Sequence, residues 1–197
     1  MLYPSRQTKN FIWVIGIVIA AIIGFKFFSP GGIPKEFTDS RIQGAMIAQN
    51  IVTLSNQSVD DIGKINQLDR QGNLVEATNV ALETIEKSKE IRTQAVELSN
   101  QVSKMTASLS NIESFEARQA ALEAISNRLA LISRLINYSD YLSQLLQALQ
   151  EKFAGQAGDQ KVQEAIVQIN AEVTAINNFN TQSTQAMNRF DAIVNGK

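Results

Sequence analysis

Residues 162–194 read VQEAIVQINAEVTAINNFNTQSTQAMNRFDAIV, and this stretch decides the fold class. Its mainly apolar positions recur in alternating steps of four and three, which is the heptad pattern of an α-helix that packs along one face. The positions on this face are Val162, Ile166, Ile169, Val173, Ile176, Asn180, Ser183, Met187, Phe190 and Val194. We therefore predict a long amphipathic helix over residues 159–195, with Asp159 as its N-terminal cap.

Three earlier segments show the same helical periodicity, and we predict helices at about residues 38–70, 73–112 and 114–154. The predicted core positions of the first helix are Ile47, Ile51, Leu54, Ile62, Ile65 and Leu68. Those of the third helix are Leu122, Ile125, Leu129, Ile132, Ile136, Leu142, Leu146, Leu149 and Phe153. Several further leucines widen the apolar face of this third helix.

The ends of the helices carry recognisable signals. Asn73 is followed three residues later by Glu76, which is the spacing of a capping box at the start of the second helix. Ser114 is a suitable N-terminal cap for the third helix. Gly155 suits the left-handed position that follows the end of a helix.

Helices of similar length joined by short connections favour an antiparallel arrangement, because each helix then pairs along its whole length. We expect an all-α protein in which an N-terminal transmembrane helix precedes a long up-down-up-down antiparallel four-helix bundle over residues 38–197. The alternative is an extended helical hairpin that completes its core with a second subunit. The wide apolar face of the third helix keeps that alternative open.

Residues 11–28 read FIWVIGIVIAAIIGFKFF and contain one charge, Lys26. A helix of this length spans about 27 Å, which is close to the hydrocarbon thickness of a bilayer. A cleaved signal peptide is the main alternative, but the following residues Phe27-Phe28-Ser29-Pro30 are a poor cleavage site. We predict a retained membrane anchor whose small residues Gly16, Ala20 and Gly24 form a packing face for another transmembrane helix.

The segments on either side of this anchor differ in character. Residues 1–10 form a short basic tail that contains Arg6 and Lys9, so we expect a cytoplasmic N-terminus with the bundle outside, in the periplasm or the extracellular space. Residues 29–37 contain two prolines and a pair of glycines, and we expect a hinge linker there.

The composition excludes several classes of function. The chain has no Cys and no His, which removes thiol catalysis, disulfides, zinc–thiolate sites and the commonest general base. Every acidic residue lies from Glu36 onward, and no basic cluster marks a nucleic-acid-binding face. No phosphate loop or catalytic triad is present, so we expect a protein that is not an enzyme and that uses no cofactor and no metal.

Polar residues at heptad positions are the remaining candidates for a site. They are Ser58, Ser88, Ser139, Asn177, Asn180 and Ser183. In one interpretation they form a small polar pocket between the helices. In the other they allow close packing and fix the register of the bundle.

These observations leave two hypotheses about function. The first is a structural or protein-interaction module of the cell envelope, attached to the membrane by residues 11–28 and bound to a protein partner or to copies of itself. The second is a ligand-binding or sensor module that uses the polar core positions. We favour the first, because the chain contains one apolar segment and no signalling module.

Overall fold

The computed structural model describes residues 33–156 and 158–196, and this part of the chain folds into four long α-helices with no strand. The helices are α2 (Lys35–Arg70), α3 (Leu74–Ser108), α4 (Phe115–Phe153) and α5 (Asp159–Val194), and a short 3₁₀ helix, η2 (Leu109–Asn111), continues α3. The predicted all-helical bundle is therefore confirmed. No helix within the described residues combines the length and the apolar character needed to cross a membrane.

The predicted anchor at residues 11–28, with its packing face Gly16, Ala20 and Gly24, lies outside the described residues. The described part of the chain begins just before α2, where Pro34 precedes the first helical residue. The structure therefore bears on the bundle and on the end of the predicted linker.

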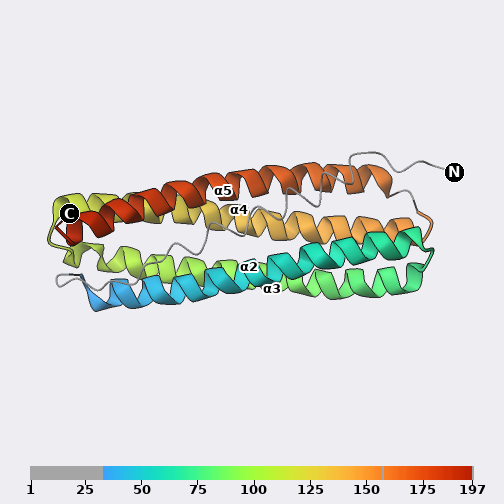
Figure 1. The fold of residues 1–197 in the computed structure, drawn as a ribbon, viewed down its shortest axis with the longest axis horizontal. Coiled ribbons are helices and arrows are strands. Elements are labelled where there is room, and N and C mark those ends of the chain that lie inside the picture. The colour runs from blue at the N-terminus through green and yellow to red at the C-terminus, as the bar shows by residue number, and fades with distance from the viewer. Residues whose placement is uncertain (1–32, 157, 197) are drawn as a thin grey trace.

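The four helices run alternately up and down, as Figure 1 shows. The start of α2, the α3–α4 connection and the end of α5 lie together at one end, which we call the near end. The α2–α3 and α4–α5 connections lie at the opposite end, which we call the far end. Neighbouring helices pack as α2 on α3, α3 on α4 and α4 on α5, whereas α2 and α5 approach each other less closely.

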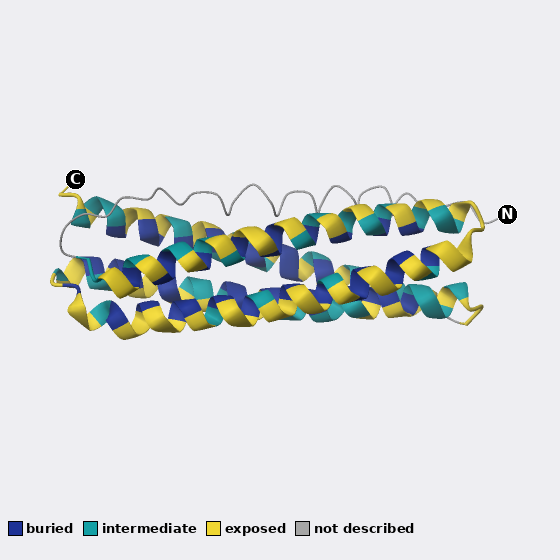
Figure 2. Ribbon diagram, turned by 90° about the horizontal axis from the view of Figure 1, so that it is seen from below, coloured by how far each residue is buried: buried dark blue, intermediate teal, exposed yellow. Residues whose placement is uncertain are grey.

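The core lies along the inner faces of all four helices, where the buried residues in Figure 2 are concentrated. The α5 heptad predicted from the sequence supplies Ile169, Val173, Ile176 and Phe190 to this core. Leu122 and Leu129 differ from the prediction, because they are 53% and 43% exposed instead of buried. The α4 face turned toward the core is built mainly from other alanines and leucines.

Helix α2 begins three residues before the predicted start. Pro34 precedes the first turn, and its carbonyl oxygen accepts hydrogen bonds from the backbone N–H groups of Phe37 and Thr38. Phe37 is almost completely buried and packs against Phe190 of α5, with 5.2 Å between the ring centroids. Burial of a side chain of this size contributes about 1.5–3 kcal/mol, which favours extending the helix into the predicted linker.

The two helices that end at the far end, α2 and α4, are each followed by a glycine in the left-handed conformation. Gly72 has a φ of 74°, and Gly155, as predicted, has a φ of 77°. After Gly155, the N–H of Gln156 donates to the carbonyl of Glu151, and the N–H of Gly155 donates to that of Lys152. This is the Schellman pattern that satisfies the last carbonyls of a helix.

The N-terminal caps follow the prediction at one helix only. The hydroxyl of Ser114 accepts a hydrogen bond from the backbone N–H of Ala117, so this cap is confirmed. Asn73 occupies the cap position of α3, but its side chain makes no capping hydrogen bond, so the predicted capping box is wrong. The cap position of α5 is Gly158, and Asp159 is the first residue of that helix.

Gly158 allows the α4–α5 connection to pass close to α4. A β-carbon added at Gly158 would lie 2.6 Å from the carbonyl oxygen of Ala148 and 3.1 Å from the β-carbon of Lys152. The oxygen is a backbone atom of a packed helix, so it has little freedom to move.

We expect Gly158→Ala to lower the free energy of unfolding by about 1–3 kcal/mol, because the added methyl group must displace the α4 backbone. Gly63→Ala in α2 is the matched control, since a β-carbon there meets nothing within 4 Å. This control should raise the free energy of unfolding by about 0.5–1 kcal/mol through helix propensity. Urea unfolding followed by circular dichroism measures both, and equal effects of the two substitutions would contradict the close approach.

Candidate functional site

The polar residues predicted at heptad positions lie in the interior of the bundle. Ser58 and Ser88 are fully buried, and Ser139, Asn180 and Ser183 are also buried. Asn177 is half-buried. These positions therefore belong to the packed part of the molecule, on α2, α3, α4 and α5.

The buried serines satisfy their hydroxyl groups mainly within their own helices. The hydroxyls of Ser58 and Ser139 donate to the carbonyls of Leu54 and Ile136, at 2.8 and 2.7 Å. Ser183 bonds across the helix interface instead, to the carbonyl of Ala124 on α4 at 3.1 Å.

Ser88 also joins two helices, but with a partner that the sequence did not indicate. Its hydroxyl donates to the carbonyl of Ile85 and lies 2.6 Å from the hydroxyl of Ser143 on α4. Ser143 is one turn further along α4 than the candidate residue Ser139. The candidate serines therefore do not form one shared polar layer. Each places its hydroxyl group against a carbonyl of its own helix or against one neighbouring helix.

The bundle interior contains a small cavity near its middle. Its volume is about 20 Å³, and it is lined from all four helices by Ala48, Ile51, Leu98, Arg128, Leu131, Leu135 and Asn180. A cavity of this size admits about one water molecule. Of the predicted polar positions, only Asn180 lines it.

Arg128 and Tyr138 bring polar groups into the core from α4. Burial lowers the pKa of Arg128 to about 10, and the nearby positive charge of Arg41 lowers it further in the same direction. The Arg128 Nε–H donates to the Ser183 hydroxyl at 3.4 Å. Burial raises the pKa of Tyr138 to about 12, against the opposing effect of its hydrogen bond with Ser55. At neutral pH Arg128 is therefore positively charged and Tyr138 is neutral.

Helices α2 and α5 are the neighbouring pair that approach each other least closely, and side chains connect them at the near end. Two Arg41 N–H groups donate to the two carboxylate oxygens of Asp191, at 2.6 and 2.7 Å. Phe37 lies one turn before Arg41 and Phe190 directly precedes Asp191, and the rings of the two phenylalanines are in contact. We call these four residues the α2–α5 latch.

Arg41 holds α2 to α5, and the apolar pattern of the sequence did not indicate this role. It is 9% exposed and occupies a regular heptad position between Phe37 and Gly44, both of which are also buried. The available signal was the uninterrupted spacing of residues 37, 41, 44 and 48, which runs through the arginine. A search restricted to apolar residues passes over it.

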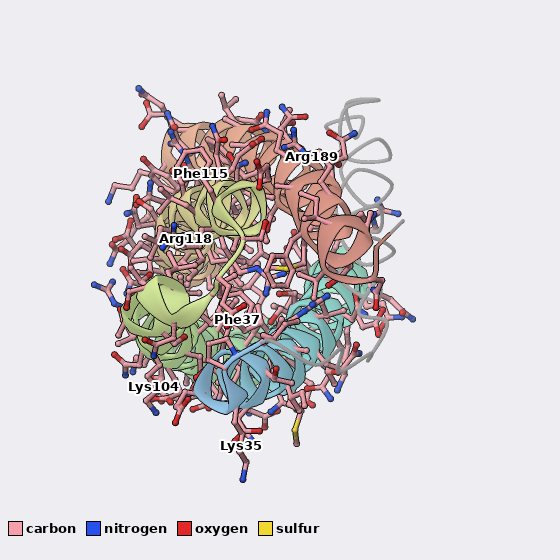
Figure 3. The ribbon with its side chains drawn as sticks, turned by 90° about the vertical axis from the view of Figure 1, so that its left-hand side faces the viewer. Lys35, Phe37, Lys104, Phe115, Arg118 and Arg189 are labelled. Carbon is pink, nitrogen blue, oxygen red and sulfur yellow. The ribbon has the colours of Figure 1, made fainter. Side chains whose placement is uncertain are left out.

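The outer face of α4 carries three exposed apolar residues at intervals of seven. They are Phe115, Leu122 and Leu129, whose exposed fractions are 66%, 53% and 43%. Seven residues are nearly two helical turns, so these side chains lie on one line along α4, about 21 Å long. We call this line the α4 stripe. Figure 3 shows Phe115 on α4, far from Lys35 at the start of α2.

The surroundings of the α4 stripe include charged residues of α3 and α4. Arg92 of α3 forms a half-exposed ion pair with Asp140 of α4. Val96 of α3 lies one turn beyond Arg92 and is 48% exposed. Arg118 lies beside the stripe near Phe115 and forms no ion pair with another described residue.

Comparison of this chain with protein families, with curated proteins and with solved structures finds no match. The arguments about function therefore depend on the residues and their geometry.

We expect Asp191→Ala to lower the free energy of unfolding by about 2–4 kcal/mol, because it leaves the charge of Arg41 inside the bundle without its carboxylate. Asp140→Ala is the matched control, since it removes a pair between helices that is about half exposed. That control should cost less than about 1 kcal/mol. Urea unfolding of the full chain in a mild detergent measures both. A loss at Asp191 no larger than that at Asp140 would contradict the assigned role of the latch.

Proposed function

We propose that this protein is a membrane-anchored, extracytoplasmic helical bundle that acts as a structural or protein-interaction module of the cell envelope. Residues 11–28 would anchor it in the membrane, and the basic residues Arg6 and Lys9 favour a cytoplasmic N-terminus. The bundle would then begin at Lys35, shortly after the anchor, with its near end toward the membrane. The α4 stripe is the observation that carries the proposed protein interaction.

Two properties of the α4 stripe favour a protein partner over solvent. Isolated exposed apolar residues are common, but a regular line of Phe115, Leu122 and Leu129 is an arrangement that another helix can contact. The spacing of seven matches the repeat with which one helix packs against another. The two leucines also lie outside the core, so their apolar character has no evident role in the packing of the bundle itself.

The chemistry around the α4 stripe indicates the kind of partner. An amphipathic helix would place apolar residues against the stripe and polar residues toward solvent. Acidic residues at the edge of such a helix would complement Arg118. The partner helix could belong to a second copy of this chain or to another envelope protein, and both possibilities use the same surface.

The interaction is tested in cells by crosslinking from beside the stripe. The chain has no native Cys, so Ser126→Cys introduces a single thiol between Leu122 and Leu129 at an exposed position. A thiol-reactive crosslinker should give one adduct, whose partner is identified by mass spectrometry. Adding Leu122→Glu and Leu129→Glu should reduce that adduct at least tenfold, because the charges would need to be desolvated at the contact.

Val167→Glu in the same Ser126→Cys background is the matched control. Val167 is 62% exposed but lies on α5, away from the α4 stripe. It should leave the adduct unchanged. The proposal is contradicted if the two leucine substitutions leave the adduct intact, or if Val167→Glu removes it equally.

A further inference from the structure

The α3–α4 connection, at the near end in Figure 1, differs from the two connections at the far end. Gly72 follows α2 with a φ of 74°, and Gly155 follows α4 with a φ of 77°. Positive φ is unfavourable for residues that carry a β-carbon, so glycine favours a turn at both of these places. Residues 73–154, which include the near-end connection, contain no glycine and no proline. The α3–α4 connection therefore has neither of the residues that most strongly interrupt a helix.

The backbone of the α3–α4 connection is already close to helical. The 3₁₀ helix η2 continues α3 as far as Asn111, so residues 112–114 alone separate it from α4. Ile112 has φ −85° and ψ 119°, and Ser114 has φ −68° and ψ 126°. Both φ values lie within the α-helical range, and Glu113 also has a negative φ. Rotation mainly about ψ at these residues would join α3 and α4 into one continuous helix.

The bundle consists of two hairpins whose internal packing is the most extensive. Helix α2 packs closely on α3, and α4 packs closely on α5. Helices α3 and α4 share a smaller contact, and α2 and α5 approach each other less closely still. Side chains that join one hairpin to the other include Ser88 with Ser143 and the α2–α5 latch. The two hairpins can therefore separate while each keeps its most extensive helix contact.

We propose that two copies of this chain exchange hairpins, with the α3–α4 connection as the hinge. When the connection straightens, the α2–α3 hairpin of one copy packs on the α4–α5 hairpin of the other copy, and the reverse. The contacts across the α3–α4 seam and at the latch re-form between the copies, so both cores keep the packing described above. The exchange loses the cap at Ser114 and gains the helical hydrogen bonds of the straightened connection.

A second copy is the occupant that the inner face of each hairpin fits. The α2–α3 hairpin presents Phe37 and Arg41, which require an aromatic ring and a carboxylate at the positions of Phe190 and Asp191. Another copy supplies both groups with the same spacing. A different protein would have to reproduce this arrangement along the length of the hairpin.

The exchange rests on the proposed function in one respect, because anchors in the same membrane raise the local concentration of the copies. In the exchanged dimer the near ends of the two bundles meet at the middle. Both α2 helices begin at the near end, so both chains would enter the dimer at its middle. This placement allows the two anchors to lie in one membrane.

The exchange is tested with two single-cysteine chains that carry different tags and are produced together. One carries Ser88→Cys and the other carries Ser143→Cys. The two hydroxyl oxygens are 2.6 Å apart, so thiols at these positions lie within reach of a disulfide. After cell breakage the proteins are oxidised with copper phenanthroline and separated by electrophoresis without reductant. We expect a disulfide-linked dimer that carries both tags. Closed bundles that meet side by side would not give it, because Ser88 is fully buried.

Gly44→Cys and Gln101→Cys, in two separate chains, are the matched control. A β-carbon at Gly44 lies 3.8 Å from that of Gln101, which is a typical distance for a disulfide. Both positions belong to the α2–α3 hairpin, which stays within one chain during the exchange. The separate chains should give no linked dimer, and the two substitutions in one chain should give an internal disulfide.

The hinge is tested by Glu113→Pro in both chains of the Ser88→Cys and Ser143→Cys pair. Proline suits the closed connection, because Ile112 before it is already extended and the backbone N–H of Glu113 donates no backbone hydrogen bond to another described residue. It prevents a continuous helix, so the linked dimer should decrease at least tenfold. Glu113→Ala permits the helix and should leave the linked dimer unchanged. Circular dichroism verifies that the variants are folded.

The exchange would be overturned if the separate Ser88→Cys and Ser143→Cys chains gave no linked dimer while the same two substitutions in one chain formed a disulfide. Equal yields from Glu113→Pro and Glu113→Ala, or a linked dimer from the control chains, would also overturn it. Oxidation follows cell breakage, so the result does not depend on the side of the membrane on which the bundle lies. The α4 stripe is tested separately through Ser126→Cys, so failure of the exchange is distinguishable from failure of the proposed function.

Discussion

The join between α2 and α5 is the constraint on which the rest of the bundle depends. The other neighbouring helices pack closely along their length, whereas these two approach less closely and are held at the near end by the α2–α5 latch. Arg41 and Asp191 are 150 positions apart in the sequence, so this contact forms only when the first and last helices of the bundle come together. It closes the ring of helices at the end where the chain enters the bundle.

With the ring closed, different faces of the bundle have separate roles. The interior is packed around single serines and a cavity for about one water molecule, which favours a rigid support over an internal ligand pocket. The features that favour interaction lie outside. The α4 stripe presents apolar side chains at the surface, and a groove between α4 and α5 is lined by the exposed residues Gln144, Gln147 and Gln168. Both surfaces involve α4, which lies diagonally opposite α2 in Figure 3.

The sequence predicted the helices well, because the heptad spacing and the glycines after two helix ends are local signals. It placed Leu122 and Leu129 in the core, since an apolar residue at helical spacing gives no information about which side its helix turns to its neighbours. The spacing of residues 37, 41, 44 and 48 indicated that position 41 faces the core, but the partner Asp191 becomes visible only when the first and last helices of the bundle meet. The sequence also provided no indication that the buried Glu172 Oε2 lacks a hydrogen-bond partner among the described residues, because this depends on how α4 and α5 are paired.

The most direct test of the account is whether the far end of the bundle lies outside the membrane. Gln156→Cys places the only thiol of the chain in the exposed α4–α5 connection. Intact cells, with any outer membrane permeabilised, are treated with a membrane-impermeant maleimide and compared with lysed cells. The account predicts rapid labelling before lysis. Labelling only after lysis would place the bundle in the cytoplasm and would contradict an extracytoplasmic module of the cell envelope.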